Sequence, residues 1–205
     1  MIEKTLISAT KENWPMLLIF MTTIVFMRLT YLAVHKEKFV LYKELFTFCA
    51  ILYALLLFYV VTFQDVNYGT NNFVPFREIT RYEVGSRLFI KNVLGNIIMF
   101  IPFGLFIAYY MKTKNALPTL FIILISSSTI EYTQMQIGRT FDIDDIFLNL
   151  TGGFIGYFIY LMFRVCESHL PPFFSSQLFK NILTILLFII TFIIYINSDL
   201  WGILR

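Results

Sequence analysis

The sequence is poor in charged residues, histidine and cysteine. Only 14% of its 205 residues are charged, whereas soluble domains carry about 25%, so most of its surface is not suited to water. The net charge of +3 is too small to indicate a nucleic-acid-binding protein, and we expect no nucleic-acid partner. The two cysteines, Cys49 and Cys166, lack CxxC spacing and give no metal or redox signal. We interpret both as free thiols, and we expect no cofactor and no metal site.

Apolar residues are abundant instead. They make up 58% of the chain, and the mean hydropathy is +0.74. A membrane-spanning helix needs about 20 apolar residues. Six runs approach that length: 14–34, 45–63, 92–111, 117–137, 143–163 and 179–197. We therefore predict an all-α fold, a polytopic integral membrane bundle of about six transmembrane helices, because the alternating strands of a closed barrel are absent.

The runs divide the chain into three parts. Residues 1–44 hold the first span and a basic loop, and that span is longer than a signal-peptide core, so we expect it to remain as an anchor. Residues 45–165 form a core of four spans with a long polar connection at 64–91, and 166–205 add a loop and the last span. Loop charge is nearly balanced, so the positive-inside rule decides only when the long connection and Arg139 are set aside. It then predicts a multi-pass cell-membrane protein with the 64–91 connection and the Arg139 region extracytoplasmic.

Polar side chains recur on single helix faces near one end of the core. In the run 92–111, Asn92, Asn96 and Phe100 are four residues apart, and Pro102 should kink the helix. The alternative is that the two asparagines only tie helices together. Arg28 in the first run is interpreted as a residue that snorkels to the interface.

The next two runs carry carboxylates. Glu131 and Gln134 share a face of the run 117–137. A stripe in steps of three and four opens the run 143–163; it consists of Asp142, Asp145, Asn149, Gly152 and Gly156. Ionisable groups at membrane depth are costly and usually mark a site. We expect Arg139 to pair with one of these carboxylates.

Simpler roles remain open for several of these residues. Asp142 alone would be a good helix N-cap, and Gly152 and Gly156 suit close helix packing. Asp144 falls off the stripe, so we expect it to be solvated. His35 and His169 are assigned to loops on the other side of the membrane, away from any site.

A Pro-interrupted segment, 71–77, precedes the core runs. It contains Asn72 and Arg77 and cannot form a regular helix or strand throughout. We expect it to fold over the polar residues as a lid, with arginines suited to phosphate or carboxylate. The predicted ligand-binding residues are Asn72, Arg77, Asn92, Asn96, Glu131, Gln134, Arg139, Asp142, Asp145 and Asn149.

Taken together, these motifs resemble the VanZ family of small bacterial membrane proteins over about residues 60–162. The pattern is Asn72-Phe-Val-Pro-Phe, Asn92-x3-Asn96-x3-Phe-x-Pro-x-Gly, Glu131-x2-Gln134 and Arg139-x2-Asp-x2-Asp-x3-Asn-x2-Gly-x3-Gly. The resemblance implies low-level resistance to teicoplanin and related lipoglycopeptides in Gram-positive bacteria. The first and last runs lie outside it.

Three functions fit these residues. The first is an outward polar site that binds the drug or a lipid-linked envelope component such as a peptidoglycan precursor, in contact with membrane lipids. The second is an intramembrane enzyme on such a precursor, in which Glu131, Asp142 and Asp145 supply acid and base or hold a metal. The sequence has no nucleophile–histidine motif or metal signature, so whether it is an enzyme stays open. The third is a lipid or small-molecule transporter.

Overall fold

The computed structural model describes residues 2–63 and 70–203, which are helical with short connections. The helices are α1 (Ile2–His35), α2 (Leu41–Phe63), α3 (Arg77–Arg81), the π-helical turn η1 (Phe89–Leu94), α4 (Gly95–Met111), α5 (Leu117–Gln136), α6 (Ile143–His169), α7 (Pro172–Ser175) and α8 (Gln177–Ile203). Each predicted apolar run coincides with a helix. Within these residues the only β-type pairing is one isolated bridge. The all-α prediction is confirmed.

Three helical stretches of the described residues are long and apolar enough to cross a membrane. They are Trp14–His35, Phe89–Met111 and Ile143–His169, and Gln177–Thr191 is a shorter apolar helix. The membrane type of the fold therefore follows from its helices. The number of six spans stays a prediction.

Several helices extend beyond their predicted apolar runs; α1 begins at Ile2 and ends at His35, for example. α6 continues past Arg164 to His169, because residues 164–169 contain neither Gly nor Pro and the first helix-breaking residue is Pro171. His35 and His169 consequently lie in the last turns of α1 and α6 rather than in loops. Arg28 also has a defined partner: it forms an ion pair with Glu44 at 2.8 Å, which joins α1 to α2.

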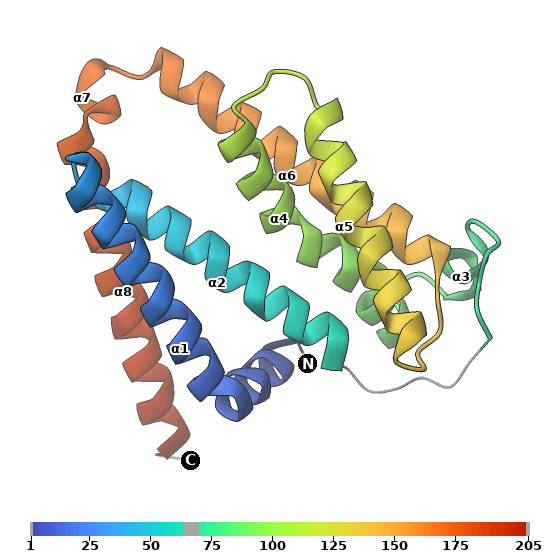
Figure 1. The fold of residues 1–205 in the computed structure, drawn as a ribbon. Coiled ribbons are helices and arrows are strands. Elements are labelled where there is room, and N and C mark those ends of the chain that lie inside the picture. The colour runs from blue at the N-terminus through green and yellow to red at the C-terminus, as the bar shows by residue number, and fades with distance from the viewer. Residues whose placement is uncertain (1, 64–69, 204–205) are drawn as a thin grey trace.

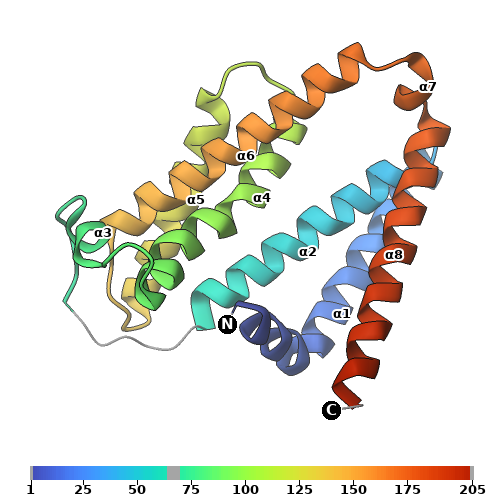
Figure 2. The same ribbon diagram turned by 180° about the vertical axis from the view of Figure 1, so that it is seen from behind.

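The helices form two groups (Figures 1 and 2). α4, α5 and α6 pack together, with the most extensive contact between α4 and α6. α1 and α8 lie on the other side of α2, which contacts both groups. A small core of Leu57, Phe100 and Ile123 joins α2, α4 and α5, and the Tyr53 hydroxyl of α2 donates a hydrogen bond to the Met99 carbonyl in α4.

Glycines bring the backbones of α4 and α6 into direct contact. A Cβ atom added to Gly152 would lie 2.1 Å from the carbonyl oxygen of Ile97, and one added to Gly156 would lie 2.1 Å from that of Ile101. Gly104 on α4 is equally close to the backbone of α6. The role of Gly152 and Gly156 as packing residues is confirmed. We call this contact the glycine seam.

Candidate functional site

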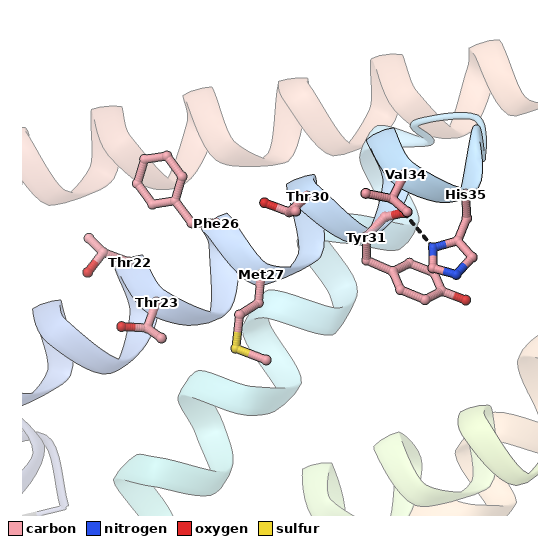
Figure 3. A pocket seen from close by; sticks show the side chains of 8 residues that line it. All are labelled: Thr22, Thr23, Phe26, Met27, Thr30, Tyr31, Val34 and His35. Carbon is pink, nitrogen blue, oxygen red and sulfur yellow. Dashed lines mark hydrogen bonds between the residues drawn. The ribbon is translucent and has the colours of Figure 1, made fainter.

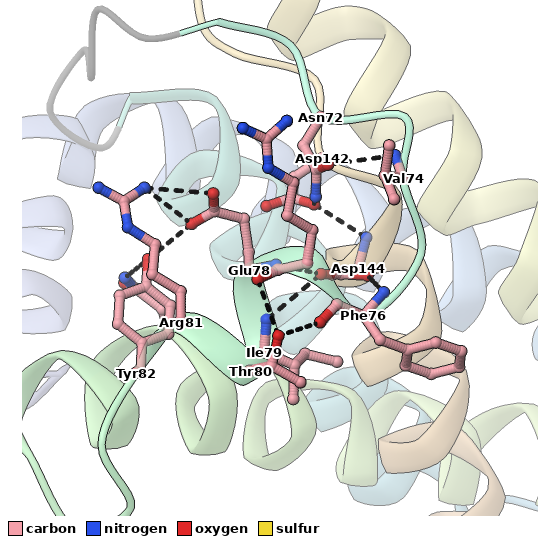
Figure 4. A network of polar contacts seen from close by, with 12 residues as sticks. Asn72, Val74, Phe76, Glu78, Ile79, Thr80, Arg81, Tyr82, Asp142 and Asp144 are labelled. Atoms are coloured by element: carbon pink, nitrogen blue, oxygen red, sulfur yellow. Dashed lines mark hydrogen bonds and ion pairs between the residues drawn. The ribbon is translucent and has the colours of Figure 1, made fainter.

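The polar residues gather where the end of α5, the start of α6 and the segment 70–81 meet. Figure 4 shows the contacts between this segment and the start of α6. Gly138, with φ of +83°, makes the turn that follows α5. The backbone of Asn72 pairs with the strand-like stretch before α6: its N–H donates to the Phe141 carbonyl at 2.8 Å, and its carbonyl accepts from the Ile143 N–H at 3.1 Å. Segments about 70 residues apart in sequence thus meet at this end.

Asp142 is the N-cap of α6, as one of the simpler roles predicted. Its carboxylate accepts a hydrogen bond from the Asp144 N–H at 2.9 Å. The same oxygen also accepts from the side-chain amide of Asn72 at 2.8 Å. Burial raises the pKa of Asp142, although these two hydrogen bonds favour the ionised form. The cap is therefore also the attachment point of the 70–81 segment.

Glu131 lies one layer beneath this cap. Its side chain is buried, with the residue 2% exposed, and one carboxylate oxygen accepts from the Asp142 N–H at 2.9 Å. Arg139 is half-buried and interacts electrostatically with Glu131 and Asp145. Burial lowers the pKa of Arg139, and the two carboxylates partly offset this effect. The expected pairing of Arg139 is thus realised as an interaction shared between two acids. We call Glu131, Arg139, Asp142 and Asp145 the polar cluster.

Amide side chains surround the polar cluster on the helix faces. Asn96 of α4 donates to the carboxylate of Asp145. One turn deeper, Asn149 donates to the Ser127 hydroxyl at 2.9 Å, while its own side-chain oxygen has no hydrogen-bond partner among the described residues. Gln134, near the end of α5, is also buried, and its backbone carbonyl accepts from the Arg139 N–H at 2.9 Å.

Asn92 departs from the arrangement predicted for it. It lies in the π-helical turn η1, whose wider turn changes the face on which its side chain emerges relative to Asn96 and Phe100. Its amide donates to the Tyr82 hydroxyl at 2.9 Å instead of reaching the carboxylates. Asn92 therefore connects the turn before α4 to Tyr82, which directly follows α3.

Asp144 is a site residue that the sequence pattern missed. We expected it to be solvated, but it is only 1% exposed. Its carboxylate accepts hydrogen bonds from the backbone N–H groups of Phe76, Glu78 and Ile79, the Glu78 distance being 2.7 Å (Figure 4). It thereby caps α3 from another helix. Phe76, the N-cap residue of α3, makes no capping hydrogen bond with its own side chain, so Asp144 takes that role.

The 70–81 segment also rests on aromatic contacts. Phe73 stacks on Phe141 with ring centroids 5.1 Å apart, and Phe76 stacks on Phe147 at 5.4 Å. The segment therefore lies over the start of α6, as the lid prediction requires. Arg77, in contrast, is exposed at the start of α3. That the ten predicted residues bind a ligand remains a prediction.

Two hollows of the surface lie away from the polar cluster. One, of about 690 Å³, follows α1 between Thr22 and His35 (Figure 3). The other, of about 300 Å³, lies among apolar side chains of α2, α4 and α5. Among the described residues no group of three or more His, Cys, Asp or Glu side chains is placed to hold a metal ion.

Comparisons with known proteins agree with this architecture. The VanZ/LLP1 family model matches residues 45–164, which include α4, α5, most of α6 and the polar cluster. The chain is 39% identical over 72 residues to Protein VanZ of Enterococcus faecium; the match covers 34% of this chain and 44% of that protein. It thus spans less than half of that relative. No solved structure matches the chain. Because the family model covers more than half of the sequence, this membrane protein belongs to the VanZ/LLP1 family.

Proposed function

We propose that this protein raises the tolerance of a Gram-positive cell to teicoplanin and related lipoglycopeptides. In this proposal the polar cluster, on the extracytoplasmic side, binds the polar part of a lipid-linked envelope component such as a peptidoglycan precursor, or of the drug itself. The family membership supports the first statement. The convergence of charged and amide groups at one end of the α4–α6 group supports the second.

The observation that carries the proposal is the burial of Glu131. A carboxylate inside an apolar helix bundle is costly unless it is paired. The hydrogen bond from the Asp142 N–H occupies one oxygen of this carboxylate, while the side-chain cap of α6 is made by Asp142. Glu131 and Asp145 also share the charge of Arg139, and the amides of Asn72 and Asn96 point into the same region. One cation, several acceptors and several amide donors suit a ligand rich in amide and hydroxyl groups.

The positions of the two histidines favour binding over histidine-dependent catalysis. His169 is the last residue of α6, 26 residues after its first residue, Ile143, which corresponds to about 39 Å of helix. His35 ends α1, in the other group of helices. A carboxylate-based enzyme is the second candidate, because Glu131 and Asp145 are close enough to interact electrostatically and carboxyl groups serve as general acids and bases.

Drug susceptibility tests the proposed function. In a teicoplanin-sensitive Gram-positive host we expect the wild type to raise the inhibitory concentration of teicoplanin severalfold and to leave that of vancomycin unchanged. Asp142→Asn should lose this effect at an equal membrane level, because Asn still caps a helix but removes a charge from the polar cluster. Glu167→Gln, which removes an exposed carboxylate near the far end of α6, is the matched control and should behave as wild type. No change with wild type would overturn the resistance role, and an active Asp142→Asn would overturn the site.

Glu131→Gln separates binding from catalysis. Gln keeps an oxygen that can accept from the Asp142 N–H but can neither give nor take a proton. If the polar cluster only binds, we expect at least half of the teicoplanin tolerance to remain. Complete loss in a variant of normal membrane level and thermal stability would favour the carboxylate-based enzyme instead. Tolerance that also falls when Mg²⁺ is withdrawn would indicate a metal-assisted form of it.

A further inference from the structure

The segment 73–91 exposes large apolar side chains before and at the start of the apolar stretch Phe89–Met111. Their exposed fractions lie between 52% and 87%. These side chains are Phe73, Val74, Phe76, Val84, Leu88 and Ile90. Such a concentration on a single connection marks an interaction surface rather than a face in contact with water.

Cations alternate with these apolar residues. Arg77 and Arg81 are four residues apart on α3, and Arg87 and Lys91 are four residues apart in the helical stretch that includes η1. All four are exposed. The segment contains four basic and two acidic residues, Glu78 and Glu83, so it is net positive. This combination of apolar and basic side chains is that of segments that lie in a membrane interface.

The structure also fixes this segment at the start of an apolar helix. Its last residues, 89–91, are the first of the apolar stretch Phe89–Met111, so a membrane crossed by that helix would have its surface next to the segment. Asp144 caps α3, and the stack of Phe76 on Phe147 fixes the chain before it. The apolar and basic side chains are therefore presented on an ordered support.

We propose that the segment 73–91 is an interfacial anchor that binds anionic phospholipid. Its exposed apolar side chains enter the boundary between headgroups and acyl chains, and its arginines and Lys91 contact the lipid phosphates. This proposal goes beyond the proposed function, since it assigns Arg77 to lipid and uses no residue of the polar cluster.

A tryptophan reporter tests the anchor in the full-length protein. Phe73→Trp is placed in a Trp14→Phe, Trp201→Phe background, which removes both native tryptophans. The protein is reconstituted in nanodiscs of mixed phosphatidylglycerol and phosphatidylcholine, with bromine on the chains of one lipid or the other. We expect brominated phosphatidylglycerol to quench the reporter at least twofold more than brominated phosphatidylcholine at equal mole fraction. High salt should remove this difference.

Charge variants identify the residues responsible. Arg77→Gln with Arg81→Gln should abolish the preference for phosphatidylglycerol, whereas Lys112→Gln with Lys114→Gln, after α4, should leave it intact. A Val84→Trp reporter repeats the measurement at a second, 87% exposed position. Quenching by aqueous iodide but not by either lipid would overturn the anchor, and equal quenching by the two lipids would overturn anionic recognition. No drug is involved, so failure here and failure of the resistance role are distinguishable.

Discussion

Gly152→Val is expected to abolish the folded protein or to lower its thermal unfolding temperature more than any exposed substitution in α6. The added side chain starts with a Cβ atom 2.1 Å from the Ile97 carbonyl oxygen, a distance at which backbone must move. Overpacking a core that can adjust costs about 1–3 kcal/mol. This cost should be exceeded here, because the obstacle is main chain and α4 also packs against α5 and α2.

Thermal unfolding of purified protein in detergent is the measurement, with the folded fraction read by size-exclusion chromatography. Ile155→Val, on an exposed position of the same helix, is the matched control and should unfold close to wild type. Gly152→Ala should lie between the two. An unfolding temperature for Gly152→Val equal to that of wild type would show that α4 and α6 do not touch at the glycine seam.

Asp144→Ala is expected to release the 70–81 segment while the helix bundle stays folded. The substitution removes the acceptor of three backbone N–H groups, those of Phe76, Glu78 and Ile79. Hydrogen bonds to a charged group contribute about 1.5–3 kcal/mol each, which is enough to open a short helix locally without global unfolding. Asp144→Asn should have a smaller effect, because its amide oxygen can still accept.

Trypsin reports this opening directly, because Arg77 and Arg81 lie within the released segment. We expect cleavage there at least tenfold faster in Asp144→Ala than in wild type, followed by mass spectrometry of the fragments. Glu83→Gln, an exposed acid of the same connection, should not change the rate. Equal cleavage of Asp144→Ala and wild type would mean that the carboxylate does not hold α3.

Sequence patterns predicted what depends on a single helix. Apolar runs located the long helices, the spacing of Gly152 and Gly156 indicated close packing, and Asp142 was recognisable as a cap because capping is local. Asp144 was misjudged because its partners, 65 to 68 residues earlier, are backbone groups that leave no residue-specific pattern. A helix-face count says which side chains share a side, but not which distant segment lies opposite.

The π-helical turn was missed for a related reason. The sequence has a constant four-residue spacing at Asn92, Asn96 and Phe100. This spacing does not indicate a π-helical turn at 89–94. The structure assigns the three residues to three partners: Tyr82, Asp145 and the apolar core. Tertiary contacts determine which partner each residue has, and a local sequence pattern does not contain them.

The glycine seam also limits how the molecule can move. The main chains of α4 and α6 touch, so neither helix can slide along the other without a steric clash. The two helices therefore form one rigid unit. Asn96 on α4 and Asp145 on α6 belong to this rigid unit, so the distance between their side chains is maintained. Glu131 on α5 and Asn72 on the 70–81 segment lie outside this pair of helices. A ligand that widens the polar cluster must therefore displace α5 or the 70–81 segment, while α4 and α6 keep their positions relative to each other.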